Sequence, residues 1–577
     1  VSLSAGTRTN RGSLNLNYAK GRFGLNFNGS GWYNIPRKSF TEFFREDVIE
    51  GESRILDQNG EGRSNFFGPR FSLGAFYDIN AYNSINTSIN FRGFGRNNDQ
   101  TTIATYIDPV QDLNQYYERI SETSAFRSGF DWTTDYRKTF KKKEQEFSAA
   151  FQVSGDYSNS VNDFDQRDTF PDIDPTLDIR NRNSNDGINL EYTGQVDYVH
   201  PFNDRIKLET GLKTIIRRIE SDFESEIFDF DREEFVILPN QTDVFFYNQD
   251  VYAAYASVNW KLGEKYGLVA GARYEFTDIS GRFDTDPTRF SNDYGNFLPS
   301  IILNRKLSRF SNIKIAYNQR IQRPSLRTVN PYVDLSDPRN IRFGNPLLEP
   351  ELTHQTELSY NTFVKGWVFN GSVYYRHTQD EIDPITTVDS IGRTVTTFQN
   401  VGRNDVVGIN FFSSYTIKKF LTLRGGMDIQ NITAVGQVDG VDTRRNAWEW
   451  RANLNVTFSL PKDFKIELFG FYNSPRQSLQ GSRGAYSQFS IGAAKELWNK
   501  RGSIGFSVIQ PFTNTLSFPR NITGPDFTQR SNFEVEIRSF NLNFSYRFGK
   551  LDFKDRRRRR SKINNDDIQN GGGGIGG

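Results

Sequence analysis

Alternation of apolar and polar residues with a period of two is the dominant pattern along this chain. It is clear at LNLNY (14–18), WVFNGSVYYRH (367–377), FKIELFGFY (464–472) and NLNFSYRF (541–548). Successive side chains of a β-strand point to opposite faces, so each segment predicts a strand with one apolar and one polar face. About twenty-two such strands are expected, whereas helical periodicity is scarce.

The connections between these predicted strands alternate between tight turns and long polar segments. The tight turns include FNDR (202–205) and PKDF (461–464), and the long segments include residues 35–64, 159–186 and 322–352. Short turns on one rim and long loops on the other are typical of outer-membrane barrels. We therefore expect an all-β fold, a transmembrane antiparallel β-barrel of about 22 strands. Its turns would be periplasmic and its long loops extracellular.

Composition is consistent with this expectation. Hydrophobic residues make up only 36% of the chain and the mean hydropathy is −0.64, yet 15% of residues are aromatic. The apolar runs are too short for a transmembrane helix, but each membrane strand of a barrel is half polar and lowers the hydropathy. The chain has no cysteine, which excludes disulfides and thiolate metal sites.

The sequence divides into a predicted barrel, residues 1–550, and a predicted tail, residues 551–577, that is basic and then glycine-rich. We expect the tail to be disordered and periplasmic. RRRRR (556–560) directly follows the predicted closing strand, so contact with lipid or a partner protein is favoured over contact with nucleic acid. No signal peptide opens the chain, and we expect one upstream of Val1.

The predicted polar faces would line the barrel lumen. Ten residues are expected there: Asn15, Asn17, Asn86, Asn90, Arg92, Asn370, Arg376, Asn541, Asn543 and Arg547. A barrel of about 22 strands encloses a lumen too wide for its own side chains to fill. No segment within residues 1–550 is left over as a plug, so we expect a plug domain upstream or on another chain.

The segment RIQRPSLRTVNPYVDLSDPRNIRFGNPLLEPEL (320–352) carries a family resemblance. Its matching elements are Arg323-Pro324, Asn330-Pro331 and GNPLLEPE (344–351), supported by INNDD (563–567) in the tail. It resembles the barrel of TonB-dependent receptors, especially the outer-membrane barrel family abundant in Bacteroidota.

The resemblance implies a protein of the Gram-negative outer membrane that imports a siderophore, cofactor, peptide or glycan with energy from TonB. It also implies contact with outer-membrane lipid and lipopolysaccharide, and an association with a surface lipoprotein. The chain shows neither the plug nor the TonB box of that family. The alternative is therefore a non-transporting structural barrel, a subunit of a larger outer-membrane assembly or secretion complex.

Two groups of candidate site residues emerge. In segment 320–352, Arg323, Arg327, Tyr332, Arg339 and Arg342 are candidates for binding an anionic ligand, because arginine forks suit carboxylates and phosphates. The alternative is structural: prolines and glycine make this loop rigid and set the register of the next strand.

The second group lies in the last predicted strand, which must pair with the first, near Ser2 to Thr9, to close the barrel. Phe544, Tyr546 and Phe548 are expected to face lipid, and the pattern resembles the terminal assembly signal of outer-membrane proteins.

The sequence gives little support for a metal site or for catalysis. His200, His354 and His377 are too scattered along the chain for a metal-ligand motif. The Asp-rich stretches 162–178 and 222–234 lack calcium-loop spacing, which favours solvated acidic loops and leaves Ca²⁺ binding open. No nucleophile arrangement is visible, so we expect neither an enzyme nor a bound cofactor or metal.

Overall fold

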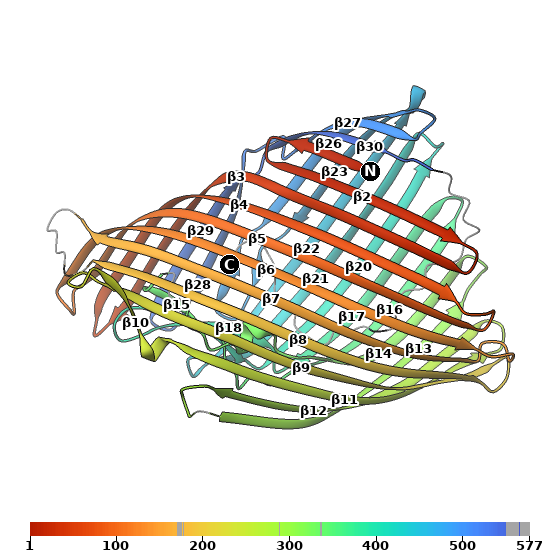
Figure 1. The fold of residues 1–577 in the computed structure, drawn as a ribbon, viewed down its shortest axis with the longest axis horizontal. Coiled ribbons are helices and arrows are strands. Elements are labelled where there is room, and N and C mark those ends of the chain that lie inside the picture. Colours follow the sequence, from red (N-terminus) through yellow and green to blue (C-terminus); the bar gives the residue numbers. More distant parts are fainter. Residues whose placement is uncertain are drawn as a thin grey trace.

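The computed structural model describes residues 1–169, 176, 178–287, 289–334, 337–549, 563 and 565. Within them, 22 strands form an antiparallel barrel in which each strand pairs with its neighbour along the chain. The first strand, β1 (Ser2–Gly6), pairs with the last, β30 (Ser539–Tyr546), from Ser2 opposite Ser545 to Gly6 opposite Asn541. The barrel is therefore closed and has no free strand edge (Figure 1).

The following strands complete the first half of the barrel: β2 (Thr9–Lys20), β3 (Phe23–Ile49), β4 (Glu52–Asp78), β5 (Asn83–Asp108), β6 (Leu113–Thr139), β7 (Glu146–Asp168), β8 (Ile179–Pro201), β9 (Ile206–Asp229), β11 (Asp243–Leu262) and β12 (Tyr266–Phe283). The second half contains β13 (Arg289–Lys306), β14 (Ser311–Gln322), β16 (Glu351–Val364), β17 (Trp367–Gln379), β20 (Arg403–Ile417), β21 (Leu421–Val438), β22 (Val441–Leu460), β23 (Phe464–Asn473), β26 (Tyr486–Leu497) and β27 (Gly502–Ile509).

Shorter elements lie in the connections: β10 (Glu234–Ile237), β15 (Asn340–Arg342), β18 (Ile382–Val388), β19 (Thr394–Asn400), β24 (Arg476–Gln477), β25 (Gly481–Arg483), β28 (Thr515–Thr523), β29 (Phe527–Glu536), the one-turn helix α1 (Leu326–Val329) and the 3-10 turns η2 (Pro239–Gln241) and η3 (Pro461–Asp463). None of the helices in the described ranges has the length and apolarity needed to cross a membrane.

The two rims of the barrel differ: short turns join the strands at one rim, and long hairpins extend from the other. The tight turns 202–205 and 461–464 lie between β8 and β9 and between β22 and β23. They belong to the rim towards the right of Figure 1, whereas the long hairpins of β3–β9 extend to the left. We call the parts of the strands near these two rims the turn region and the hairpin region. The hairpin region comprises residues 37–65, 96–124, 159–168, 179–187, 217–229 and 243–251.

Two segments predicted as long loops are largely strand, so those predictions are wrong: residues 35–64, and residues 159–186, of which 159–168 and 179–186 belong to β7 and β8. Residues 35–64 belong to β3 and β4, which are joined by a two-residue turn at Glu50 and Gly51. The physical reason is that alternation continues there with inverted polarity: Leu56 points inward and is buried, while Glu42 and Glu46 point outward. Residues 394–417, which also alternate, form two elements, β19 and β20, because Gly402 turns the chain with a φ of 100°.

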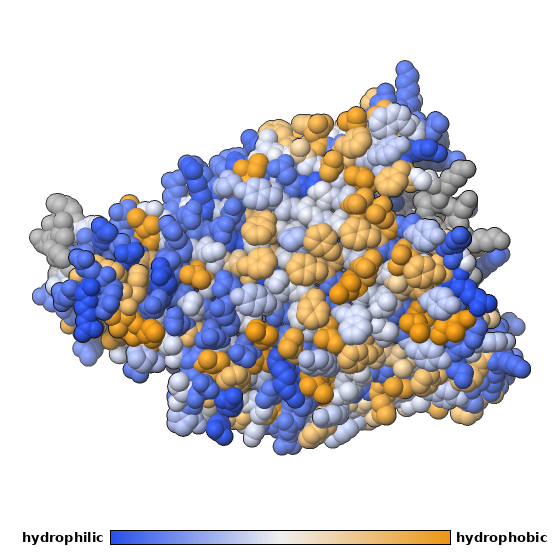
Figure 2. Space-filling view, in the orientation of Figure 1, coloured by the Kyte–Doolittle hydropathy of each residue, from blue (hydrophilic) through white to orange (hydrophobic). Residues whose placement is uncertain are grey.

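In the turn region the outward face is apolar. Leu212, Trp448 and Leu542 are among its most exposed side chains, and apolar residues gather over the middle of the strands in Figure 2. The end formed by the long hairpins is mainly hydrophilic in the same view. The inward face of the turn region is polar, as Asn541 and Asn543 show.

In the hairpin region the apolar side chains point inward. Leu56, Tyr106 and Tyr117 form one buried cluster on the inward faces of β4, β5 and β6. Phe245 and Ile219 belong to a second cluster on β11 and β9. The end of the barrel beyond the apolar belt therefore has an ordinary hydrophobic core inside its wall.

Two residues near the C-terminus lie elsewhere than the sequence predicts. Arg547, predicted to line the lumen, follows the end of β30. Of the predicted tail, only Ile563 and Asn565 are among the described residues. The Asn565 amide donates to Thr193 Oγ1 at 2.8 Å and to Glu191 on the inward face of β8, so this residue lies inside the barrel rather than in the periplasm.

Candidate functional site

Two long connections fold back into the hairpin region of the barrel. They are the described residues of 323–350 and residues 381–402, which we call the infolded part. Within it, β15 pairs in parallel with β19, and β19 pairs with β18. In Figure 1, β15 and β18 lie behind the strands of the front wall.

The infolded part is held together by GNPLLEPE. The backbone N–H of Gly344 donates to the Asn330 carbonyl at 2.7 Å, and that of Asn345 donates to the Thr328 carbonyl at 2.7 Å. A Cβ atom at position 344 would lie 2.4 Å from the Asn330 oxygen, so only glycine fits. The Glu351 carboxylate then accepts from the Ile382 N–H at 2.9 Å at the start of β16. These contacts agree with a structural role for this motif.

Arg323 is fully buried and binds the barrel wall. Its guanidinium lies 2.6 Å from Glu275 and donates to Thr277 Oγ1 at 2.9 Å, both on the inward face of β12. A charge buried in this way is stable only when it is paired. Arg323 is thus an anchor of the infolded part.

Arg339 has a comparable role on the opposite wall. Its guanidinium stacks 3.8 Å from the centroid of the Tyr106 ring. The neighbouring Asp337 carboxylate accepts from Arg119 at 2.6 Å and from Asn340 at 2.7 Å. Burial alone would raise the pKa of Asp337, but the Arg119 charge and these hydrogen bonds together lower it to about 2.

Tyr332 is also part of the packing. Its ring lies 5.5 Å from that of Phe223 and packs on the buried cluster containing Val329 and Phe245. Burial and the nearby Asp334 raise the pKa of Tyr332, so its hydroxyl stays neutral.

Arg327 and Arg342 are surrounded by other arginines. Burial and then the charges of Arg127 and Arg483 lower the pKa of Arg327. Burial, Arg327 and Arg520 lower the pKa of Arg342 to about 10. The five predicted residues thus divide into three that hold the infolded part and two that face a cluster of positive charge.

Two further anchors were missed from the sequence. Arg45 of β3 donates to the Gly392 carbonyl at 2.7 Å and pairs with Asp47 at 3.0 Å. Arg54 of β4 donates to the Ser390 carbonyl at 3.1 Å and to Asp47 at 2.7 Å. Both lie in the segment 35–64 that was predicted as loop. The one signal of their burial was an alternation in which the apolar residues face inward, and this pattern is also typical of strands in soluble proteins.

The second group of predicted residues lies at the barrel seam. Phe544 and Tyr546 belong to β30, and their rings meet that of Trp498 edge-on, with centroids 6.4 and 5.7 Å apart. Phe548 follows the end of the strand and is exposed. A role of these residues in assembly remains a prediction.

The fold brings together two histidines that are distant in sequence. His354 and His377 are direct cross-strand partners on the outward face, with ring centroids 6.2 Å apart. His377 Nδ1 lies 2.7 Å from Asp405, and the Tyr317 hydroxyl lies 3.0 Å from His354 Nδ1. Among the described residues, no group of three or more His, Cys, Asp or Glu side chains is arranged to hold a metal ion.

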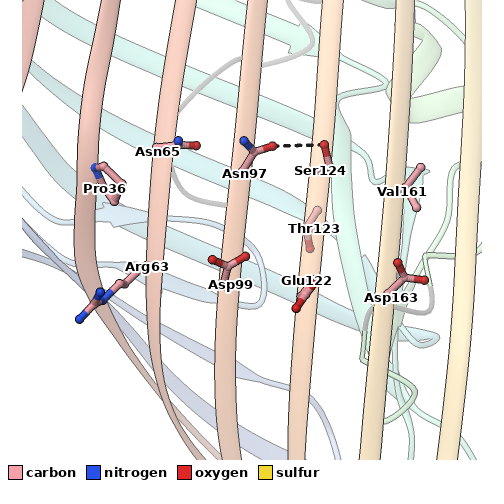
Figure 3. Close-up of a pocket in the computed structure, with 10 residues that line it drawn as sticks. All are labelled: Pro36, Arg63, Asn65, Asn97, Asp99, Glu122, Thr123, Ser124, Val161 and Asp163. Atoms are coloured by element: carbon pink, nitrogen blue, oxygen red, sulfur yellow. Dashed lines mark hydrogen bonds between the residues drawn. The ribbon is translucent and has the colours of Figure 1, made fainter.

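A hollow of about 580 Å³ lies on the outward face of the hairpin region (Figure 3). Four of its lining residues are charged: Arg63, Asp99, Glu122 and Asp163. They come from four neighbouring strands, β4 to β7, and Ser124 donates to Asn97 at 3.2 Å across its upper part. The hollow lies outside the barrel, on the opposite side of the wall from the infolded part.

A closed antiparallel barrel with an apolar belt outside and a polar lumen is a transmembrane β-barrel of the Gram-negative outer membrane. The chain belongs to the outer membrane protein beta-barrel family, whose profile matches residues 138–546. No match was found among curated protein sequences.

Solved structures of similar fold are transporters and receptors. The copper transporter OprC aligns with a TM-score of 0.60 at 13% identity, over 95% of this chain and 80% of that one. The siderophore receptor PiuA from Acinetobacter baumannii gives 0.58 at 13%, over 94% and 81%. The ferric-catecholate import receptor Fiu from K12 E. coli gives 0.57 at 12%, over 95% and 81%. At such identities the likeness concerns the fold.

Proposed function

We propose that this barrel imports a nutrient across the outer membrane with energy from TonB. The observation that carries the proposal is the infolded part. Residues from the connections leave the rim, fold into the barrel and are fixed there by Arg323, Arg339 and Arg45. The likeness of the fold to a copper transporter and a ferric-catecholate import receptor supports the same function.

Uptake by intact cells tests this proposal. Cells lacking the barrel, cells lacking TonB and the parent strain are compared for accumulation of iron as ferric siderophores, cobalamin, peptides and glycans. We expect one class of nutrient to be lost equally in both deletion strains. Normal uptake of every class, together with a barrel that co-purifies in a fixed stoichiometry with other outer-membrane proteins, would favour the structural-subunit alternative.

The polar lumen of the turn region bears on whether a plug domain fills the barrel. Asn15, Asn17 and Asn543 face it and need hydrogen-bond partners from water or protein. We propose that a folded domain, upstream or on another chain, occupies this part of the lumen. In a planar bilayer, this chain alone should show a large and weakly selective conductance, whereas the native protein should be nearly closed. Negligible conductance of this chain alone would mean that the infolded part seals the barrel.

A further inference from the structure

Two of the three histidines of the chain lie side by side on the outward face of the barrel. His354 of β16 and His377 of β17 are directly opposite each other, and their ring centroids are 6.2 Å apart. Side chains that are directly opposite in an antiparallel pair share one face, with Cβ atoms roughly 4.5–5.5 Å apart. That face is outward, because Leu358 and Val373, an even number of residues along the same two strands, are exposed members of the apolar belt.

The histidine pair lies at the border of the apolar belt, on the side of the hairpin region. His377 is ten residues beyond Trp367, which begins β17 beside a turn. A strand rises about 3.3 Å per residue, so about ten residues tilted by about 40° rise about 25 Å, which is the height of the apolar band of an outer-membrane barrel. Both rings are partly exposed, so ions in the surrounding water can reach them.

A carboxylate fixes the orientation of the His377 ring. His377 Nδ1 lies 2.7 Å from the Asp405 carboxylate on the next strand, β20, and Asp405 also accepts from the Tyr375 hydroxyl at 2.8 Å. Because an ionised carboxylate can only accept, Nδ1 of the neutral ring carries the proton and Nε2 keeps its lone pair. The amide nitrogen of Gln379, 3.4 Å from Nε2, lies where a donor to that lone pair would lie. Nε2 is therefore the nitrogen through which this ring can bind a metal ion.

His354 has a corresponding partner on its other side. Its Nδ1 lies 3.0 Å from the Tyr317 hydroxyl of β14. When Nδ1–H donates to this oxygen, Nε2 of His354 also presents a lone pair. A histidine that binds a metal almost always donates its other ring N–H to a neighbouring acceptor, which fixes the tautomer and the ring orientation. Each of the two rings thus has the hydrogen-bond partner that such a ligand needs.

We propose that His354 and His377 bind one divalent transition-metal ion, of the Cu²⁺ or Zn²⁺ class, through their Nε2 atoms. Imidazole suits these ions and binds Zn²⁺ at about 2.0–2.1 Å, so a single ion can bridge two rings at this separation. Among the described residues no group of three or more His, Cys, Asp or Glu side chains surrounds an ion, so water fills the other coordination positions. Asp405 is a positioning residue, because it acts through His377. The site lies outside the barrel wall, so it does not depend on the proposed function.

The alternative is that the two rings only pack. Tyr317, His354 and His377 form a row of rings, with successive centroids 6.3 and 6.2 Å apart. Phenylalanine in place of either histidine keeps a ring in this row but removes the nitrogen ligand. His354→Phe and His377→Phe therefore separate metal binding from packing.

Titration calorimetry of the protein in detergent, purified without a polyhistidine tag, tests the site. Cu²⁺ and Zn²⁺ serve as probes, and Mg²⁺, which prefers oxygen ligands, serves as the control ion. The chain has no cysteine and only three histidines, so few other ligands compete. We expect one Cu²⁺ ion to bind per chain, Zn²⁺ to bind more weakly and Mg²⁺ not to bind. His354→Phe and His377→Phe should each weaken Cu²⁺ binding by at least the roughly 10–100-fold that loss of an outer partner alone costs.

His200→Phe is the matched control. His200 of β8 also has a tyrosine hydroxyl near its Nδ1, that of Tyr198 at 3.2 Å, but its cross-strand partner on β9 is Leu208 rather than a histidine. Its replacement should leave Cu²⁺ binding unchanged. The site would be overturned by equal weakening in His200→Phe, by Cu²⁺ binding that neither His354→Phe nor His377→Phe weakens, or by no Cu²⁺ binding to the unaltered protein.

Electron paramagnetic resonance of the Cu²⁺ complex counts the nitrogen ligands. The unaltered protein should show two imidazole nitrogens, and His354→Phe should show one. Asp405→Asn should weaken binding about tenfold because the His377 ring is held less firmly, yet it should still show two nitrogens at saturating Cu²⁺. A single nitrogen in the unaltered protein, or undiminished affinity in Asp405→Asn, would contradict the assigned roles.

Heat-modifiable electrophoretic mobility shows which variants are folded before they are titrated. His354→Phe leaves the contact between His377 and Asp405 intact, so this variant carries the test if His377→Phe does not fold. None of these measurements involves TonB or uptake, so a failure of the metal site is distinct from a failure of the proposed function.

Discussion

The turn region and the hairpin region of this barrel share one continuous wall but have opposite polarity. In the turn region, apolar side chains such as Leu212 and Leu542 point outward. In the hairpin region, Leu56, Tyr117 and Phe245 point inward and are fully buried. The strands pass from one region to the other without a break. Hydrocarbon surrounds the first region and water the second, so the surroundings decide which face of a strand is apolar.

This difference explains where the infolded part lies. An inward apolar face can pack against other chain segments, and Val329 and Tyr332 of the infolded part do pack on it. The polar inward face of the turn region offers no such surface. The infolded part therefore occupies the hairpin region rather than the lumen beside the turns.

The largest expected effect comes from truncating an inward aromatic residue of the hairpin region. Phe245→Ala should lower the free energy of unfolding by about 3–5 kcal/mol, because it leaves a cavity in a buried cluster. The neighbouring Phe246 points outward, and Phe246→Ala should cost clearly less. Urea unfolding in detergent measures both. Equal losses would show that this region has no inward core.

Breaking an anchor of the infolded part should cost nearly as much. Arg323→Met removes one of the two guanidinium groups that pair with the buried Glu275, which keeps Arg273, and also removes the donor to Thr277, so it should cost about 2–3 kcal/mol. Arg92 of the turn region also pairs with two carboxylates, Asp131 and Asp156, but it is about half exposed. Arg92→Met should therefore cost at most about 1 kcal/mol. The unfolding midpoints of the two variants show how much more a buried ion pair contributes to stability than a hydrated ion pair in the lumen.

These contrasts show how far the sequence alone predicts the fold. Alternation with an apolar outward face identified the strands of the turn region, the number of strands and the tight turns. It failed for residues 35–64, because β3 carries Glu42 on its outward face and β4 carries Leu56 on its inward face, and strands without an outward apolar face resemble polar loops.

The candidate site is even harder to predict from the sequence than the fold, because it depends on which residues become cross-strand neighbours. Arg483 and Arg520 are opposite each other only through the register of β25 and β28, and His354 meets His377 only through that of β16 and β17. No spacing rule reveals these pairs. Arg327 and Arg342 could be chosen from the sequence because they lie in one segment with recognisable proline and glycine positions.

A third comparison uses neighbouring residues of one strand. Phe544→Arg should cost about 2–4 kcal/mol if the side chain lies near the bilayer midplane, and less towards the interface. Asn543 points inward and donates to Ser507 at 3.1 Å, and Asn543→Arg should be tolerated far better. The amount of heat-modifiable, folded protein in outer-membrane fractions measures both. Equal assembly of the two variants would contradict the assigned facing.

The smallest expected effect is a response of the infolded part to pH. The folded-state pKa of Asp383 is raised to about 7 by burial and by Glu381, while Arg483 opposes the rise. A raised pKa means that stability is fully present below the unfolded value near 4 and is lost as the pH rises through 7. Amide exchange in β18, corrected for its intrinsic pH dependence, should be slower at pH 5 than at pH 8. Asp383→Asn should remove this difference.

Labelling of single cysteines on intact cells tests most directly whether the hairpin region stands outside the cell. The chain has no cysteine of its own, so Glu122→Cys and Lys462→Cys each provide one thiol. Glu122 lies on the outward face of the hairpin region, and Lys462 lies in a tight turn between β22 and β23. A membrane-impermeant maleimide should label position 122 on intact cells and position 462 only after the outer membrane is permeabilised. Labelling of position 462 but not 122 on intact cells would contradict the account.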